Sequence, residues 1–107
     1  MFSGKIDPSP FDLKHLIYLD LSYNDFGGTH IPKFLNSMGS LRYLNLSHSG
    51  FGGLIPHQLG NLSNLHYLNL GLNNDLYVKN LQWLSGLPLL QHLDLSFANL
   101  SKVSCWL

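Results

Sequence analysis

Histidine and cysteine are the residues of this sequence whose side chains could bind a metal ion or act as a nucleophile. The chain has one cysteine and six histidines, His15, His30, His48, His57, His66 and His92. The histidines form no HxxxH pair and no His–Cys pair at zinc-ligand spacing, and a zinc site needs three or four such ligands. We therefore expect no metal site, and we expect these histidines to lie at the surface.

Catalysis and cofactor binding are not expected either. Cys105 stands in the sequence Ser-Cys-Trp, without a neighbouring histidine or acid that could activate its thiol. The glycines follow neither the GxGxxG pattern nor the P-loop pattern of nucleotide-binding loops. The sequence therefore favours a non-catalytic protein without a cofactor.

A repeated motif organises most of the chain. The sequence Leu-x-Leu recurs at steps of 24 or 25 residues, starting at Leu19, Leu44, Leu68 and Leu93. The shared frame is LxxLxLxxN, and the first two copies are followed by Phe-Gly-Gly and Ile-Pro. Alternating leucines point to one side of a short strand, and a single strand cannot bury them alone. We therefore expect successive copies to stack on one another.

Stacking predicts an α/β repeat fold, a solenoid with short parallel strands on its concave face and 3-10 or irregular turns on its convex face. Asn24 and Asn73 end two copies of the motif, where an amide side chain can hydrogen-bond the backbone of its own and neighbouring turns. The chain forms one array, 1–107, which divides into a partial repeat at 1–15, repeats at 16–40, 41–64 and 65–89, and a partial repeat at 90–107.

The motif has three departures from its frame. Ser49 and Ala98 stand where asparagine is expected, and the third repeat has the segment 74–80 in place of Gly-x-Ile-Pro. We expect an irregular convex loop over that segment. The incomplete repeats at both ends predict marginal stability or end-to-end association of the chain.

Residues between the strand leucines are expected to form columns on the concave face, because neighbouring strands lie about 4.8 Å apart. An aromatic column beside a column of amides and carboxylates could hold a peptide or glycan by stacking and hydrogen bonds. Alternatively, the tyrosines only stabilise the sheet by cross-strand packing. The predicted ligand-binding residues are Tyr18, Asp20, Tyr23, Arg42, Tyr43, Asn45, His48, His66, Tyr67, Asn69, His92 and Asp94.

The two aspartates of this face do not predict an acid–base pair. Asp20 and Asp94 belong to strands three places apart, which separates them by about 14 Å. That distance exceeds the separation of paired catalytic carboxylates.

The segment 41–64 resembles the plant extracellular class of leucine-rich repeat, whose consensus is roughly LxxLxxLxLxxNxLxGxIPxxLGxLxx, nearly position for position. The phrases DLKHLIYLDLSYNDFGGTHIP and NLQWLSGLPLLQHLDLS look like the disease-resistance receptor-like proteins of plants. The resemblance implies part of an ectodomain that a single span holds at the plasma membrane, with the repeats outside the cell. It also implies recognition of a protein, peptide or glycan ligand, and defence signalling through a co-receptor kinase.

Two alternatives remain open at this point. Similar repeats occur in secreted plant proteins that inhibit the cell-wall hydrolases of pathogens, so this chain could belong to an inhibitor. It could also be a truncated product without independent activity.

The remaining sequence features bear on partners and modification. Six basic and six acidic residues cancel, so contact with nucleic acid or an anionic membrane is not expected. The sequence has no signal-peptide core and no apolar run long enough to span a bilayer. Three N-x-S sequons make Asn61, Asn99 and Asn45 candidates for glycosylation, and Asn61 fits the outer part of its turn best.

Overall fold

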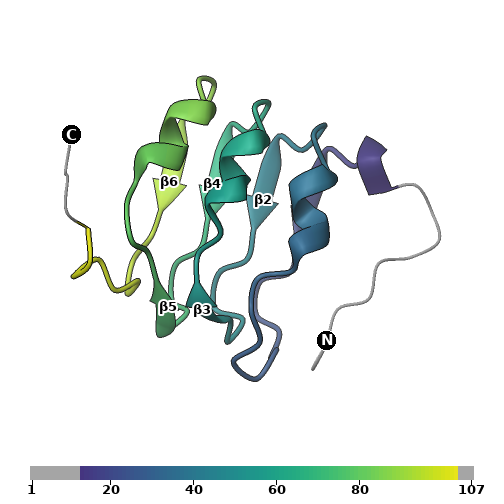
Figure 1. Ribbon diagram of the computed structural model, residues 1–107. Helices are drawn as coiled ribbons and strands as arrows, with labels where there is room; N and C mark the ends of the chain where they lie inside the picture. The colour runs from purple at the N-terminus through teal and green to yellow at the C-terminus, as the bar shows by residue number, and fades with distance from the viewer. Residues whose placement is uncertain (1–12, 104–107) are drawn as a thin grey trace.

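Four short parallel strands form the main sheet of the computed structural model, which describes residues 13–103. The strands are β1 (Tyr18–Asp20), β2 (Tyr43–Asn45), β4 (Tyr67–Asn69) and β6 (His92–Asp94), and they lie side by side in that order (Figure 1). Equivalent residues of successive repeats face each other without a register shift, because the repeats have nearly constant length. The predicted parallel sheet is confirmed. Cys105 and most of the segment 1–15 lie outside the described residues.

Short 3-10 helices cover the opposite side of the array. They are η1 (Leu13–His15), η2 (Lys33–Ser37), η3 (His57–Asn61) and η4 (Gln82–Gly86). Pro32 and Pro56 stand directly before η2 and η3 in extended conformation, where a fixed φ of −65° or −71° turns the chain into the helix. The prediction of 3-10 turns on this side is confirmed. Within residues 13–103, no helix has the length and hydropathy to cross a bilayer.

The expected irregular loop in the third repeat is wrong, because the chain forms a strand there. β5 (Asp75–Tyr77) pairs in parallel with β3 (Gly52–Leu54) in a second, two-stranded sheet at the foot of the array (Figure 1). Leu76 and Val78 are buried while Tyr77 between them is half-buried, which is the alternation of a strand. The pairing uses backbone groups, so it does not require the Gly-x-Ile-Pro sequence that this repeat lacks.

Leucines from the strands form the core between the sheet and the helices. Those in and directly after the two central strands, Leu44, Leu46, Leu68 and Leu70, are fully buried. Leu93 on the outer strand β6 is 37% exposed, since no further repeat of the described chain covers it. Phe26 and Phe51 stack at 4.7 Å between ring centroids and extend this core toward the second sheet.

Trp83 belongs to the core although the repeat motif did not predict it. Its side chain is 7% exposed, and its indole Nε1 donates a 3.1 Å hydrogen bond to the carbonyl oxygen of Asn80. The neighbouring Leu84, which the frame favours as the anchor of this turn, is only partly buried. The indole therefore anchors η4 together with Leu87, which is 4% exposed.

The predicted asparagine contacts between turns are confirmed at Asn73, which is 1% exposed. Its amide nitrogen donates to the carbonyl oxygens of Leu46 and Leu70 at 2.9 and 3.0 Å. Ser49 substitutes for asparagine one repeat earlier, and its hydroxyl donates to the carbonyl oxygen of Leu21 at 2.6 Å. In the second repeat, the hydroxyl of Ser49 therefore makes one of the contacts between turns that the amide of an asparagine would make.

Candidate binding face

The aromatic residues of the main sheet form one stacked row on the concave face, which we call the stacked row: Tyr18, Tyr43, Tyr67 and His92. Neighbouring rings lie 4.2, 4.3 and 4.4 Å apart between centroids, and their planes deviate by less than 10° from parallel. This follows from the register, which puts the first residue of each strand beside its equivalent in the next. The inner rings use both of their faces for stacking, so the row offers mainly ring edges and hydroxyl groups to solvent.

The hydroxyl groups of the two central tyrosines have fixed neighbours. The amide nitrogen of Asn69 donates to the hydroxyl oxygen of Tyr67 at 3.2 Å, and that of Asn45 donates to the hydroxyl of Tyr43 at 3.4 Å. Each hydroxyl oxygen accepts one hydrogen bond in this arrangement and keeps its own proton to donate. The central part of the row therefore carries two hydroxyl donors.

The column of amides and carboxylates has a structural role at the ends of the strands. In each repeat the side-chain Oδ1 accepts a hydrogen bond from the backbone N–H two residues later, which closes a turn. The four bonds run from Ser22 to Asp20 (2.9 Å), Ser47 to Asn45 (3.0 Å), Gly71 to Asn69 (2.9 Å) and Ser96 to Asp94 (2.8 Å). These side chains therefore already use part of their hydrogen-bonding capacity inside the protein.

Asp94 is the acid of this column whose proton affinity is clearly changed. The hydroxyl and the backbone N–H of Ser96 donate to its carboxylate, and His92 lies nearby. These contacts lower the pKa of Asp94 below its ordinary value of 3.8, although partial burial acts in the opposite direction. The carboxylate is therefore charged at neutral pH and strengthens its own turn.

A second row follows each turn, and its members have left-handed backbone conformation. We call it the left-handed row: Tyr23, His48, Leu72 and Phe97, with φ of 59°, 50°, 60° and 70°. This conformation disfavours residues with a side chain by about 1 kcal/mol or more. All four side chains are exposed, with 65% for Tyr23, 42% for Leu72 and 68% for Phe97. The row is thus an exposed strip of aromatic and aliphatic side chains in a costly conformation.

The predicted site residues divide between these rows and their flanks. Tyr23 and His48 stack at 4.8 Å in the left-handed row, whereas Arg42 is exposed and His66 half-buried beside the stacked row. Leu72 and Phe97 were not among the predicted binding residues. Their exposure could have been inferred, because they occupy the same motif position as Tyr23 and His48. In residues 13–103, no three histidine, cysteine or acidic side chains converge as a metal site would require.

The sequon asparagines have different surroundings. Asn61 is exposed at the end of η3, and no hydrogen bond of its side chain is recorded among the described residues. Asn99 is exposed, and its Oδ1 accepts a 2.8 Å hydrogen bond from the backbone of Ser101. Asn45 is half-buried, with its Oδ1 bonded to Ser47 and its nitrogen directed at Tyr43. Glycosylation of these residues stays a prediction, and the geometry favours Asn61.

Comparison with known proteins places this architecture in a family. A model described as "Leucine rich repeat" matches residues 39–100, and another, "Leucine Rich Repeat", matches residues 15–38. The chain is 50% identical over 104 residues to Receptor-like protein EIX1 of Solanum lycopersicum, an alignment that covers 97% of this chain and 10% of that protein. It is 37% identical over 75 residues to Receptor-like protein 39 of Arabidopsis thaliana, covering 68% of this chain and 8% of the relative.

The chain spans about a tenth or less of the length of these relatives. The repeat model covers more than half of this chain, and the structure has the strand and turn in each repeat that the motif predicts. The protein therefore belongs to the leucine-rich repeat family, with repeats of the kind found in the receptor-like proteins of plants.

Proposed function

We propose that the concave face is a non-catalytic recognition surface for an extended protein or peptide segment. The observation that carries this proposal is the pair of parallel rows on one open face, the stacked row and the left-handed row. Four exposed side chains stay in left-handed conformation although asparagine or glycine would fit there at lower cost. Residues that keep a strained backbone and an exposed apolar side chain support a role in binding.

The chemistry of the rows favours a peptide over a glycan. A sugar ring packs its C–H groups against an open aromatic face, and the inner rings of the stacked row use their faces on one another. The row instead presents hydroxyl donors, which suit the carbonyl groups of an extended chain. The apolar side chains of Leu72 and Phe97 suit the side chains of the same ligand.

The similarity to receptor-like proteins supports a place for this surface in a longer receptor. In this proposal the parent protein is held at the plasma membrane, the repeats lie outside the cell, and ligand binding contributes to defence signalling through a co-receptor kinase. The match covers a small part of each relative, so the proposal for this chain concerns its own concave face.

A selection experiment tests the proposal. The 107-residue chain is immobilised and panned against displayed random peptides, and the enriched peptides are then measured against single variants by interferometry. We expect Phe97→Asn to weaken the enriched peptides about fivefold or more, since truncating an apolar anchor typically costs above 1 kcal/mol. Asparagine tolerates the left-handed backbone, so the variant should keep its fold.

The matched control is Gln82→Ala, an exposed position on η4 on the opposite side of the array. This variant should bind the peptides as the unmodified chain does. Failure to enrich any peptide, or peptides that Phe97→Asn leaves unaffected while Gln82→Ala weakens them, would refute a recognition role for the concave face. A parallel glycan array tests the ligand class, and selective glycan capture would overturn the preference for peptides.

A further inference from the structure

Two junctions between helices of the convex side, η2 with η3 and η3 with η4, differ in how closely the backbones approach. At the junction of η3 with η4, a β-carbon at Gly60 would lie 2.6 Å from the carbonyl oxygen of Trp83, and one at Gly86 would collide with Gly60. The helices therefore meet backbone to backbone. Asn36 and Asn61 occupy the equivalent positions at the junction of η2 with η3, where side chains prevent such an approach.

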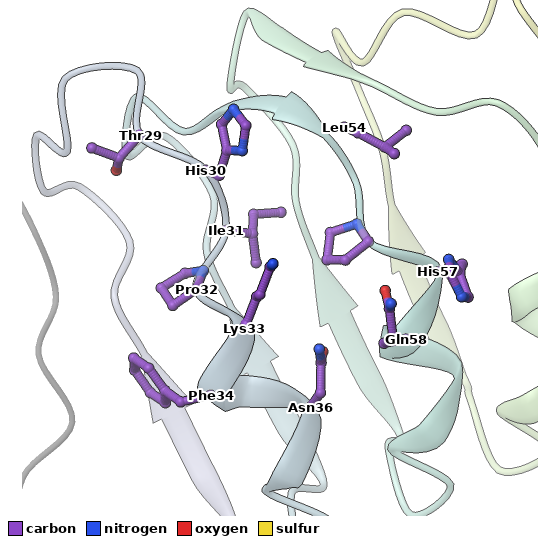
Figure 2. A pocket seen from close by; sticks show the side chains of 11 residues that line it. Thr29, His30, Ile31, Pro32, Lys33, Phe34, Asn36, Leu54, His57 and Gln58 are labelled. Carbon is purple, nitrogen blue, oxygen red and sulfur yellow. The ribbon is translucent and has the colours of Figure 1, made fainter.

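A groove lies at the junction of η2 with η3, and Figure 2 shows it from close by. Its volume is about 710 Å³, against about 390 Å³ for the smaller cavity beside Gly60 and Gly86. The larger volume lies in the range of small-molecule sites, about 300–1,000 Å³. Most of the wall is apolar and comes from Ile31, Phe34 and Leu54 together with the two prolines that precede the helices.

Lys33 is the charged residue of the groove, and hydroxyl, amide and imidazole side chains supply its other polar groups. Lys33 and Asn36 project from η2 into the groove, and His30 stands at one end (Figure 2). The described residues that line the groove include no acid that could pair with Lys33. An ammonium group beside an apolar wall without a counter-ion attracts an anion.

Asn36, which lines the groove, has an unpaired side-chain oxygen. Its Oδ1 atom is buried and has no hydrogen-bond partner in the described structure. A buried acceptor without a partner costs about 1–3 kcal/mol, so such atoms usually have a partner in the functional state. This oxygen accepts hydrogen bonds and so requires a donor such as a hydroxyl, whereas the amide nitrogen of Asn36 can donate to an anion in the groove that this residue lines.

From these observations we propose that the groove between η2 and η3 binds a small organic anion with a flat apolar body, such as an aromatic carboxylate. The body packs against Phe34 and Leu54, the carboxylate pairs with Lys33, and the amide of Asn36 hydrogen-bonds the carboxylate or a hydroxyl beside it. The site lies on the side opposite the concave face and does not depend on the function proposed for that face.

Two probes of equal shape test the charge requirement. The isotope-labelled 107-residue chain is titrated with 2-naphthoate and with the neutral 2-naphthamide, and amide resonances are followed by NMR. We expect naphthoate to shift the resonances of His30, Asn36 and Leu54, with a dissociation constant on the order of 1 mM or tighter for a ligand of this size. Naphthamide should bind several-fold more weakly. Equal affinities, or shifts that concentrate around Leu93 or the stacked row, would overturn the proposal.

Two variants separate the charge from the shape of the groove. Lys33→Gln should weaken naphthoate about fivefold and leave naphthamide unchanged, whereas Lys102→Gln, an exposed lysine in the last described turn, should change neither. Leu54→Trp should fill the groove and abolish binding of both probes without lowering the melting temperature. Probe binding that persists in Leu54→Trp would refute the site.

A dilution series of the unliganded chain separates a ligand site from self-association. Groove resonances that move with protein concentration before any probe is added would mean that a second copy occupies the groove, and the small-molecule proposal would be wrong.

Discussion

The backbone N–H of Ser49 donates a 3.0 Å hydrogen bond to the Oδ1 atom of Asn73, which lies 24 residues further along the chain. The same oxygen accepts from the N–H of Phe51 at 3.1 Å, and the amide nitrogen of Asn73 donates back to Leu46. One buried side chain thus holds the turn of one repeat against the next. This contact adds to the backbone pairing that keeps the second and third repeats in register.

Asn73→Ala should therefore be severely destabilising. The substitution leaves buried N–H and C=O groups of two repeats without partners, and each such group costs about 1–3 kcal/mol. We expect a loss of about 3 kcal/mol or more in the free energy of unfolding, measured by urea titration followed by circular dichroism. A chain with few repeats has little stability to spare, so complete loss of the cooperative transition would also agree with this expectation.

Asn64→Ala is the control for this prediction. Asn64 is exposed and donates one 3.0 Å hydrogen bond to the carbonyl oxygen of Gly39 in the preceding repeat. Its loss should cost about 1 kcal/mol or less, because water can replace the bond. Equal losses in Asn64→Ala and Asn73→Ala would contradict the central role that we assign to Asn73.

The stacked row should stabilise the sheet unevenly along its length. Tyr67 has a ring neighbour on each side, at 4.3 and 4.4 Å, whereas the single described neighbour of Tyr18 is Tyr43. Aromatic pairs contribute about 0.5–1.5 kcal/mol each, so Tyr67→Ala should cost roughly twice as much as Tyr18→Ala. Tyr67→Phe keeps the ring and should cost little. Urea melts of the three variants check the order, and a costly Tyr67→Phe would mean that the hydroxyl contact outweighs the stacking.

Leu72→Asn should raise stability while it removes apolar surface from the concave face. Leu72 has a φ of 60° and is 42% exposed, and asparagine adopts this conformation more easily than leucine. We expect a gain of about 0.5–1 kcal/mol in the free energy of unfolding, at an unchanged slope of the urea titration. A loss of stability would show that the leucine side chain packs usefully in place, and would weaken the argument that function retains it.

Gly86→Ala should open the junction between η3 and η4. A β-carbon there would collide with the carbonyl oxygen of Gly60, which is backbone and cannot move aside alone. We expect a loss of about 1–3 kcal/mol, typical of overpacking. Gly39→Ala is the matched control, because a β-carbon at Gly39 meets no atom within 4 Å, and it should be neutral or slightly stabilising. Thermal melts of both variants show whether the loss of stability in Gly86→Ala comes from the steric collision or from the replacement of any glycine by alanine.

The main sheet could be predicted because the leucine spacing that produces it can be read from the sequence. Leucines at alternate positions and a step of 24 or 25 residues require stacked strands in constant register. β5 was missed because its repeat lacks the Gly-x-Ile-Pro sequence, although Leu76 and Val78 keep the alternation of a strand. The backbone pairing and two apolar positions were enough to preserve the structure where the motif was lost.

Other features of the candidate sites could not be predicted from the types of amino acid in the sequence. Tyr23, Leu72 and Phe97 are not residues that favour a left-handed backbone, so residue type does not predict the conformation that they share with His48. The convex groove depends on which pairs of residues meet between neighbouring helices. Asn36 became informative only once its structural counterpart, Gly60, was seen to allow close contact in the next junction.

The stability of the turn that follows β6 should depend on pH through Asp94. Hydrogen bonds from Ser96 lower the folded-state pKa of Asp94, so its contribution to stability is present above the pKa of the unfolded chain, about 3.9. That contribution is lost as the pH falls through the lower folded-state value. Asp94→Asn keeps the acceptor oxygen, as Asn45 and Asn69 do in the equivalent turns, but has no charge to titrate.

The variant should therefore be modestly less stable than the unmodified chain at pH 7, and the difference should shrink as the pH is lowered below about 4. Thermal melts of both proteins between pH 7 and pH 3 measure it. Asn45→Asp offers the reverse comparison, because it adds a titratable group to an equivalent turn whose serine, Ser47, donates in the same way. The difference in thermal stability between Asp94→Asn and the unmodified chain could instead stay constant down to pH 3. That result would mean that the carboxylate contributes only as a hydrogen-bond acceptor, as the asparagines do, and not through its charge.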